Sequence, residues 1–512
     1  MFCYWATEMS EVMSMQNYEK IIELLKEQKY TQATALLSKF CVSYMDEQAF
    51  AQLEECLAQI PDEVKRKSGQ LCFLQVSVEL RRGRTRPARQ WYSQLVALRD
   101  ACKEGSRERA QLAQLICIAG MMMPQTDNAQ LLLLLSVMHN EMVTYKVPPI
   151  QISLTMRRPS VLRGAKDLSE WGRNYRAVAS IVKPLLPSLM LESGEGACAA
   201  GIAELLYEKN QLNDASMTVA AALSDENIEI AFAGYAQLAL IARLDGTSAR
   251  ADEILATLGR LLEEKNATEL MPTYRALCTR FDIHFGRLEK VRTWLDESTL
   301  VGLGDCRLSN VYELITRAQA LIALSQCREA ITLLESLLLL LRTDFRPLDT
   351  IECLAHSAVA CELLGSRDLA MDKLEEALTL AEPYRYIRVI ADCGRAMFQL
   401  LTQFAKDSAR SGGISERYLS EVTEAAKTYS MLYPKLYSQE SLPEDNAYTP
   451  DLTSTELQIL QMISEGKTAR AISEQLGIKP TTVKFHTANI FEKLAVTNRV
   501  EAVNAAKKFK IL

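Results

Sequence analysis

A pair of helices joined by a short polar turn recurs along this chain at a nearly constant interval, and this repeat is the feature that most limits how the chain can fold. Apolar residues recur every three or four positions on both sides of a short polar turn, and the second helix of each pair opens on a small residue. The small residues of the regular series are Ala215, Ala251, Val291, Ala330 and Ala370, at intervals of 36, 40, 39 and 40 residues. Less regular examples of the same pattern end at Ala33 and Ala88.

A two-helix unit of this size cannot bury its apolar face by itself, so neighbouring units must stack into a superhelix. The small residue allows the two helices of a unit to cross closely. The chain has only 21 Gly and 15 Pro in 512 residues, which also favours helices. The pattern resembles tetratricopeptide (TPR) repeats, with units longer than the roughly 34-residue standard. An irregular helical bundle is the alternative, and it predicts no fixed interval.

Two polar segments divide the chain. Residues 153–171 interrupt the helical periodicity with arginines, a proline and glycines, which predicts a loop followed by a new helix near Lys166. Residues 437–451 are polar and contain two prolines, as expected of a linker. We therefore expect an N-terminal helical region of irregular repeats (1–152), a TPR-like array (153–436), a linker (437–451) and a C-terminal domain (452–512).

The charges are unevenly distributed. Residues 452–512 contain nine basic and five acidic residues, a net charge of +4. The rest of the chain contains 49 basic and 59 acidic residues, a net charge of −10. A small basic domain attached to a large acidic body is typical of a tethered DNA-binding module.

Cysteine and histidine usage argues against metal sites and disulfides. The thirteen cysteines form no CxxC pair, and none of the four histidines lies at zinc-ligand spacing from two cysteines. The leucine runs 131–135 and 337–341 are far shorter than the roughly 20 apolar residues of a membrane span, and residues 1–15 do not have the pattern of a signal peptide. We expect a cytoplasmic protein with no metal, no cofactor and no membrane contact.

The C-terminal domain has the pattern of four short helices. Thr453 and Glu456 form a capping box before the first helix, whose apolar stripe is Leu457, Leu460 and Ile463, and Gly466 ends it. The second helix spans residues 468–476, glycine at 477 permits a tight turn, the third helix spans about 480–494, and the fourth begins near residue 499.

The third of these helices has two unlike faces. Its buried stripe is predicted to be Val483, Thr487, Ile490 and Leu494, and the opposite face carries Lys484, Phe485, Ala488 and Asn489. A second helix of this kind after a glycine turn can lie in a DNA major groove. A plain four-helix cap on the array is the alternative.

This segment resembles the DNA-binding domain of LuxR-type (GerE-like) regulators. The matching positions are Leu452, Thr453, Glu456, Leu460, Gly466, Ile472, Leu476, Thr482, Val483, Lys484, His486, Ile490, Lys493, Leu494, Arg499 and Ala502. The resemblance implies that Lys484, Phe485 and Ala488 face base edges and that Thr481, Thr482 and Lys493 hold phosphates. The only hydrogen-bonding side chains for base readout are then Lys484 and Asn489. The fourth helix is where such domains pair on DNA, which implies a homodimer.

The sequence departs from the LuxR pattern at Thr455, Ala471 and Lys479, where the pattern has arginine, an acidic residue and serine. Lost caps and surface ion pairs cost about 1 kcal/mol each, which does not threaten the fold. The expected fold is therefore all-α, a TPR-like helical-repeat superhelix followed by a four-helix LuxR-type helix-turn-helix domain.

Residues 376–401 resemble the segment that closes the array in MalT-like LuxR regulators. Large regulators of that subgroup also have an N-terminal ATPase domain, which we do not find: the GKT triplet at 466–468 lacks the preceding glycine of a phosphate loop, because Gln461 stands there. We expect no ATP binding, in a chain that is either a shortened relative or a piece of a longer one.

The sequence therefore predicts a transcription regulator that binds double-stranded DNA, controlled by a small-molecule or protein effector on the array. The alternative is a protein-interaction scaffold with a weak or vestigial DNA-binding domain, which the scarcity of base-reading side chains would suit. The sequence contains no phosphate loop, metal-ligand cluster, nucleophile elbow or aspartate cluster of a phosphoreceiver domain, so we do not expect an enzyme. The effector, the operator and the sign of regulation do not follow from the sequence.

Overall fold

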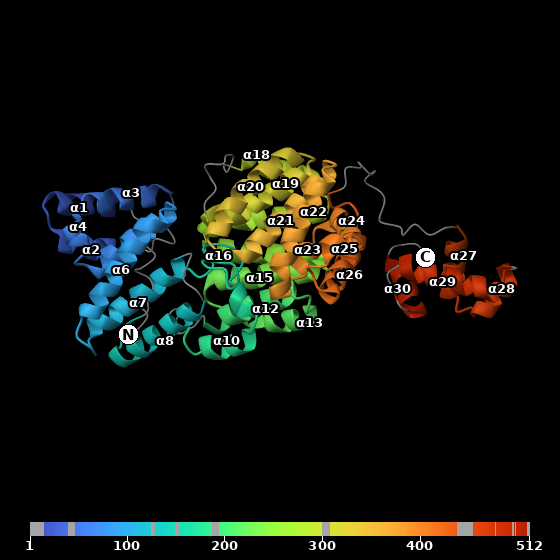
Figure 1. Ribbon diagram of the computed structural model, residues 1–512, viewed down its shortest axis with the longest axis horizontal. Coiled ribbons are helices and arrows are strands. Elements are labelled where there is room, and N and C mark those ends of the chain that lie inside the picture. Colours follow the sequence, from blue (N-terminus) through green and yellow to red (C-terminus); the bar gives the residue numbers. More distant parts are fainter. Residues whose placement is uncertain are drawn as a thin grey trace.

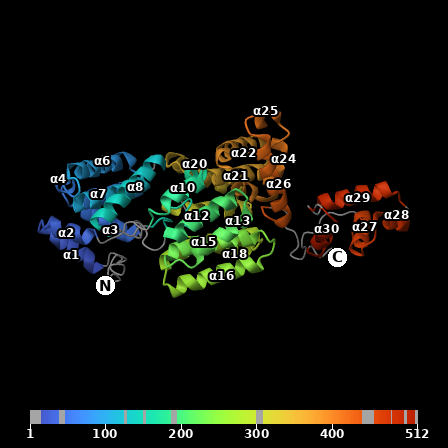
Figure 2. The same cartoon turned by 90° about the horizontal axis from the view of Figure 1, so that it is seen from below.

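The computed structural model describes residues 15–38, 47–123, 128–148, 153–186, 194–298, 308–437, 454–476, 478–493, 496 and 498–508. Within these ranges the chain forms helices and no β-strand, apart from one isolated bridge between Arg163 and Asp167. The all-α fold predicted from the sequence is confirmed. Figures 1 and 2 show three groups of helices, coloured blue, green to orange, and red along the chain.

The bounds of the helices follow the chain. The first group comprises α1 (Met15–Lys26), α2 (Tyr30–Leu37), α3 (Glu47–Ala58), α4 (Asp62–Lys65), α5 (Gly69–Arg81), α6 (Thr85–Ala101), α7 (Arg107–Met122) and α8 (Asn128–Tyr145). The second begins with α9 (Ser169–Gly172), α10 (Tyr175–Val182), α12 (Gly194–Glu208), α13 (Leu212–Thr218), α14 (Ala220–Leu223), α15 (Ile228–Arg243), α16 (Ala249–Glu264), α17 (Met271–His284) and α18 (Leu288–Glu297). It continues with α19 (Val311–Ala323), α20 (Cys327–Thr343), α21 (Pro347–Leu363), α22 (Arg367–Ala381), α23 (Arg388–Ala391), α24 (Gly394–Phe404), α25 (Ser408–Ser411) and α26 (Glu416–Leu432). The third comprises α27 (Ser454–Ser464), α28 (Ala469–Leu476), α29 (Pro480–Lys493) and α30 (Arg499–Lys508).

A turn with one positive-φ residue joins the two helices of each of the seven pairs that the sequence predicts. One residue of each turn has a positive φ, between 59° and 77°; these residues are Gln28, Gly83, Asn210, Gly246, Gly286, Ser325 and Gly365. Six of the turns are Schellman motifs, as at Gly365, where the N–H of Ser366 donates to the carbonyl of Cys361 at 2.9 Å. The last carbonyls of the first helix thereby gain partners, and the chain reverses within a few residues.

The predicted small residues lie where the two helices of each pair cross. Ala215, Ala251, Val291, Ala330 and Ala370 are all 0% exposed, as are Ala33 and Ala88 in the irregular pairs. A larger side chain at such a position would push the helices apart, so the recurring alanine is a packing requirement.

Residues 153–168, which we call the buried loop, run through the interior instead of along the surface. The sequence predicts a loop in this region, and the structure agrees, but the following helix begins at Ser169 rather than near Lys166. The reason is local: the carboxylate of Asp167 accepts a hydrogen bond from the backbone N–H of Ser169 at 2.9 Å and fixes a turn there. Asp167 also accepts from the N–H of Leu348 at 2.9 Å, which ties this turn to α21.

Arginine side chains connect the buried loop to α21. Arg158 donates to Asp349 at 2.8 Å and to the carbonyl of Leu308, and Arg346 donates to Asp349 at 2.7 Å and to the carbonyl of Arg163 at 2.6 Å. Burial by itself would raise the pKa of Asp349, but the guanidinium groups of Arg346, Arg158 and Arg163 outweigh it and hold that pKa well below its usual range.

A second buried carboxylate on α21 extends this ionic network. Glu352 pairs with Arg163 of the loop and accepts from Arg280 of α17 at 2.6 Å. Burial opposes ionisation, yet these two guanidinium groups lower the pKa of Glu352 to about 2. Buried ion pairs with several hydrogen bonds fix one arrangement of the chain, because removing either partner leaves a charge without compensation.

Candidate nucleic-acid interface

The first two helices of the C-terminal domain are set by a turn and a cap. Gly466 has a φ of 76°, and the N–H of Lys467 donates to the carbonyl of Met462 at 3.1 Å, so α27 ends in another Schellman motif. The hydroxyl of Thr468 then accepts from the N–H of Ala471 at 3.3 Å and caps α28. The predicted capping residue of α27, Thr453, lies outside the described residues.

Hydrogen bonds around residue 478 position the start of α29. The hydroxyl of Ser473 donates to the carbonyl of Ile478 at 2.6 Å, and the N–H of Ile478 donates to the carbonyl of Ser473 at 3.2 Å. α29 begins at Pro480, where a proline is tolerated because the first N–H of a helix has no partner within it. The glycine turn predicted at residue 477 lies outside the described residues.

All four helices contribute to one hydrophobic core. Its buried members are Ile459, Leu460, Ile463, Ile472, Val483, Ile490, Ala502 and Ala506. One expectation for this core is wrong: Leu457 is 40% exposed, whereas Glu456 is buried at 2%. The helix is rotated relative to the predicted stripe, and Ile459 takes the place expected of Leu457.

The helix α29 shows the two unlike faces that its sequence predicts. Of the predicted buried stripe, Val483 and Ile490 are fully buried, Thr487 is only half-buried, and Leu494 lies outside the described residues. Lys484, Phe485 and Ala488 are exposed and form what we call the outer face. The side chain of Phe485 is 63% exposed, so its ring is accessible on the outer face. Figure 1 shows α29 between its three neighbours α27, α28 and α30.

The other predicted contact residues lie at the edges of the outer face. Asn489 and Thr482 are half-buried, and Thr482 donates its backbone N–H to the carbonyl of Lys479 at 2.9 Å. Thr481 and Lys493 belong to α29, but their side chains lie outside the described residues. The structure thus brings together Lys484, Phe485 and Ala488, with Asn489 beside them.

Two family models match the chain. Residues 189–407 match the family described as "MalT-like TPR region", and residues 450–506 match "Bacterial regulatory proteins, luxR family". The chain joins a MalT-like TPR region to a LuxR-family domain. The helix that the LuxR resemblance assigns to the major groove is α29.

Similar curated proteins have matching descriptions. The HTH-type transcriptional regulator MalT of Yersinia pestis (strain Pestoides F) is 31% identical over 147 residues, which are 27% of this chain and 16% of that protein. The MalT of Yersinia pseudotuberculosis serotype O:1b (strain IP 31758) gives the same values. The transcriptional regulatory protein DesR of Bacillus subtilis (strain 168) is 32% identical over 74 residues, 14% of this chain and 37% of DesR. The match thus spans only a small part of the MalT relatives.

The combination of a MalT-like repeat region with a LuxR-type helix-turn-helix domain supports a DNA-binding transcription regulator. In the part of the chain that the structure describes, no helix is both long and apolar enough to cross a membrane. Across those same residues, no three histidine, cysteine or carboxylate side chains are grouped so as to hold a metal ion.

Proposed function

We propose that this chain regulates transcription by binding double-stranded DNA through α29, under the control of an effector or protein partner held by the TPR-like array. The observation that carries the proposal is the outer face of α29: a cationic, an aromatic and a small side chain exposed together on the groove-binding helix of a LuxR-family domain. Their exposure leaves them available to a duplex.

The three side chains supply different contacts in this proposal. Lys484 donates to guanine acceptors in the major groove or to phosphate, whereas Phe485 contacts a thymine methyl group or the edge of the duplex. Ala488 allows the helix to approach closely. Thr481, Thr482 and Lys493 hold the phosphate backbone, and Asn489 reads adenine at the margin of the contact.

The test begins with fragmented genomic DNA of the source organism passed over the immobilised full chain. A retained duplex is then titrated by fluorescence anisotropy with the wild type, Lys484→Ala and Lys406→Ala. Lys406 is an exposed lysine in the array, so Lys406→Ala makes the same change in charge away from α29. We expect Lys484→Ala to weaken binding by about 1–3 kcal/mol, and Lys406→Ala to bind like the wild type.

The salt dependence of binding shows whether Lys484 contacts a phosphate or a base. The wild-type affinity should fall steeply as salt rises, because bound phosphates release counterions. If Lys484 contacts a phosphate, its loss reduces the slope of log K against log salt concentration by about 1. If it contacts a base, that slope stays unchanged and the preference for one DNA sequence weakens. Equal retention of DNA by wild type and Lys484→Ala, with no effect of salt, would refute the role of α29 and favour the scaffold alternative.

We also propose that two copies pair through α30 on DNA. Asn498 caps this helix by accepting from the N–H of Glu501 at 2.9 Å, so the helix is well defined at its start. Paired half-sites are then expected about one helical turn apart. Sedimentation of the complex with duplexes of varied half-site spacing measures this, and a stoichiometry of one chain per site at every spacing would contradict it.

A further inference from the structure

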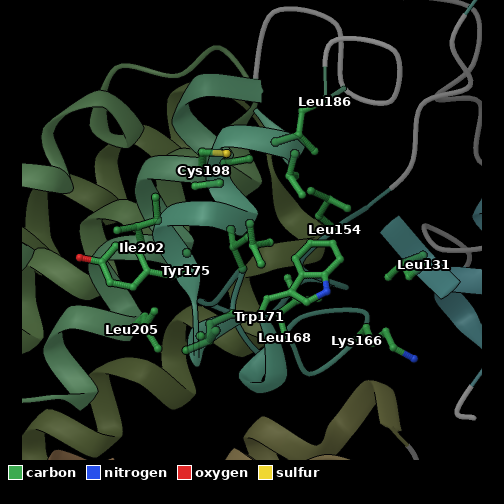
Figure 3. A pocket seen from close by; sticks show the side chains of 18 of the residues that line it. Leu131, Leu154, Lys166, Leu168, Trp171, Tyr175, Leu186, Cys198, Ile202 and Leu205 are labelled. Atoms are coloured by element: carbon green, nitrogen blue, oxygen red, sulfur yellow. The ribbon is translucent and has the colours of Figure 1, made fainter. Parts of the chain in front are cut away.

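An apolar cavity lies where the first group of helices meets the array. Its volume is about 130 Å³, and its walls come from α7 and α8 on one side and from α9, α10 and α12 and the buried loop on the other. Side chains that define it include Leu131, Leu154, Trp171, Tyr175, Ile202 and Leu205. Figure 3 shows Trp171 in the middle of this group, with Leu131 approaching from α8.

The walls of the cavity offer almost no polar contact. Lys166 is the one charged residue that lines it, and its ammonium group donates to the backbone carbonyl of Met123 at 3.2 Å. A water molecule needs two to four polar partners to be held firmly, and these walls offer almost none, so an apolar ligand can displace water from this space at little cost. An engineered cavity of about 150 Å³ with similar aliphatic and aromatic walls binds benzene.

A ring seated against these apolar walls gains dispersion contacts from each of them. We propose that this cavity is a binding site for a neutral, single-ring aromatic compound of about the size of toluene. The indole of Trp171 and the phenol ring of Tyr175 can meet such a ring edge to face or offset. Aliphatic side chains cover its remaining sides.

Elsewhere in the described chain, a larger but more polar hollow of about 820 Å³ lies between the turn that joins α12 to α13 and the helices α23 and α26. Its cationic groups are already engaged. Arg385 and Arg417 pair with Glu421, Arg388 pairs with Asp392, and Lys209 donates to the carbonyl of Gly172 at 2.8 Å. The walls of the apolar cavity, by contrast, include a single charged residue, so no network of ion pairs occupies them.

A ligand in this cavity can control DNA binding because the cavity lies between two groups of helices, and this part of the proposal rests on the proposed function. Leu131 belongs to α8, whereas Ile202 and Leu205 belong to α12 of the array. A ring held between them favours the arrangement in which the first group of helices is closed onto the array, because it binds that arrangement better than an open one. The ligand would thereby shift the DNA-binding equilibrium.

The test uses the full chain and ¹⁹F NMR with two probes of equal ring size, neutral fluorobenzene and anionic 4-fluorobenzoate. We expect fluorobenzene to bind and 4-fluorobenzoate to bind at least about tenfold more weakly, because a carboxylate loses its hydration against apolar walls whose one charged residue, Lys166, already donates to the carbonyl of Met123. Ala179→Leu fills the cavity from α10, and should weaken fluorobenzene binding about tenfold or more. Ala177→Leu, at an exposed position of the same helix, should bind like the wild type.

Cys198 provides a readout that needs no variant. Its half-buried thiol lines the cavity, and burial raises its pKa, so alkylation by iodoacetamide is slow. Bound fluorobenzene should slow alkylation of Cys198 further and leave Cys102, a half-buried thiol outside the cavity, unchanged. Peptide mass spectrometry measures both rates.

The proposal is overturned if fluorobenzene does not bind, if Ala179→Leu binds it as well as the wild type, or if 4-fluorobenzoate binds more tightly. A separate titration with DNA tests the control. Fluorobenzene binding without any change in DNA affinity would refute control through this cavity and leave the site intact. Failure of the chain to bind DNA would refute the proposed function without touching the binding of fluorobenzene.

Discussion

Glu204 of α12 shows how much a single buried side chain does in this molecule. It is only 7% exposed, and it accepts hydrogen bonds from the hydroxyl of Ser160 and from the backbone N–H groups of Val161 at 2.8 Å and Leu162 at 3.3 Å. Three donors of the buried loop therefore depend on one carboxyl group. Burial nevertheless raises its pKa to about 7, so the neutral form is favoured in the folded protein over a wide range of pH.

Glu204→Gln should change how stability depends on pH. Because the folded pKa is raised, the native state holds this proton more tightly than the unfolded state does; the resulting stabilisation is complete below about pH 4.5 and disappears as pH rises through about 7. Between pH 5 and pH 8 the wild type should therefore lose on the order of 2 kcal/mol of unfolding free energy relative to Glu204→Gln.

Urea unfolding of both proteins at several pH values measures this difference. Burial lowers the pKa of His356 to about 4 and that of His284 well below its usual value, so these two residues make stability rise with pH. Both histidines are present in the wild type and in the variant, so their contributions cancel in the difference between the two proteins. Glu226→Gln, at an exposed glutamate, should keep the wild-type pH dependence. A difference that stays constant with pH would contradict the role of Glu204.

At the scale of helices, most of the fold follows from local patterns. The seven turns lie where polar residues interrupt the apolar periodicity, and the small residue after each turn is buried as predicted. The predicted orientation of α29 also holds, because Val483 and Ile490 face the core and Lys484 faces outward. These features depend on residues within a few positions of one another, which is the range over which helical periodicity acts.

The sequence predicts the loop at residues 153–168 but neither its burial nor the cavity beside it. Arg158 meets Asp349 across 191 positions, and Ser153 meets Glu229 across 76. No local pattern records such partners, so the arginines of the loop indicate only a break between helices. Likewise, Trp171 is an ordinary aromatic residue in the sequence, and only the approach of α8 makes it part of a cavity.

Ala251→Leu should disturb the crossing of α15 and α16. Ala251 is fully buried in the core that these helices share with α17, and extra methyl groups there force neighbouring side chains aside at a cost of about 1–3 kcal/mol. Ala249→Leu makes the same substitution at an exposed position of the same helix and should change stability by less than about 0.5 kcal/mol. Urea unfolding compares the two, and equal stability of both variants would show that the crossing is not tight.

Gly164→Ala tests the packing of the buried loop. A Cβ at Gly164 would lie 2.1 Å from the carbonyl oxygen of Leu154, a backbone atom that cannot rotate away, and the N–H of Ala165 already donates to that oxygen at 2.7 Å. We expect a loss of about 2–4 kcal/mol and faster trypsin cleavage at Arg157. Gly413→Ala is the control, because a Cβ there meets no atom within 4 Å. Equal trypsin resistance of the two variants would mean that the loop has room at Gly164.

At the scale of the whole molecule, the C-terminal domain has a core of its own. The cluster that contains Ile459 and Val483 draws all its members from residues 459–506, and none of the six other clusters among the described residues includes any of them. The charges divide in the same way, with +4 on residues 452–512 and −10 on the remainder. Because this domain has its own core, it can unfold independently of the helical body. Its net positive charge, opposite in sign to that of the rest of the chain, suits it to bind DNA.

The full chain should therefore show two transitions in differential scanning calorimetry. The smaller should have an enthalpy of about 0.7 kcal/mol per residue of the C-terminal domain, and the larger should come from the helical body. A retained duplex should raise the temperature of the smaller transition, because it binds that domain only when folded, while in Lys484→Ala the transition should stay near its DNA-free position. The predicted linker cannot start before residue 438, because Tyr437 is buried in the core of the array, and residues 438–451 lie outside the described ranges. A single transition that the duplex shifts as a whole would instead mean that the array and the DNA-binding domain fold as one unit, so that control of DNA binding acts through direct contact between them.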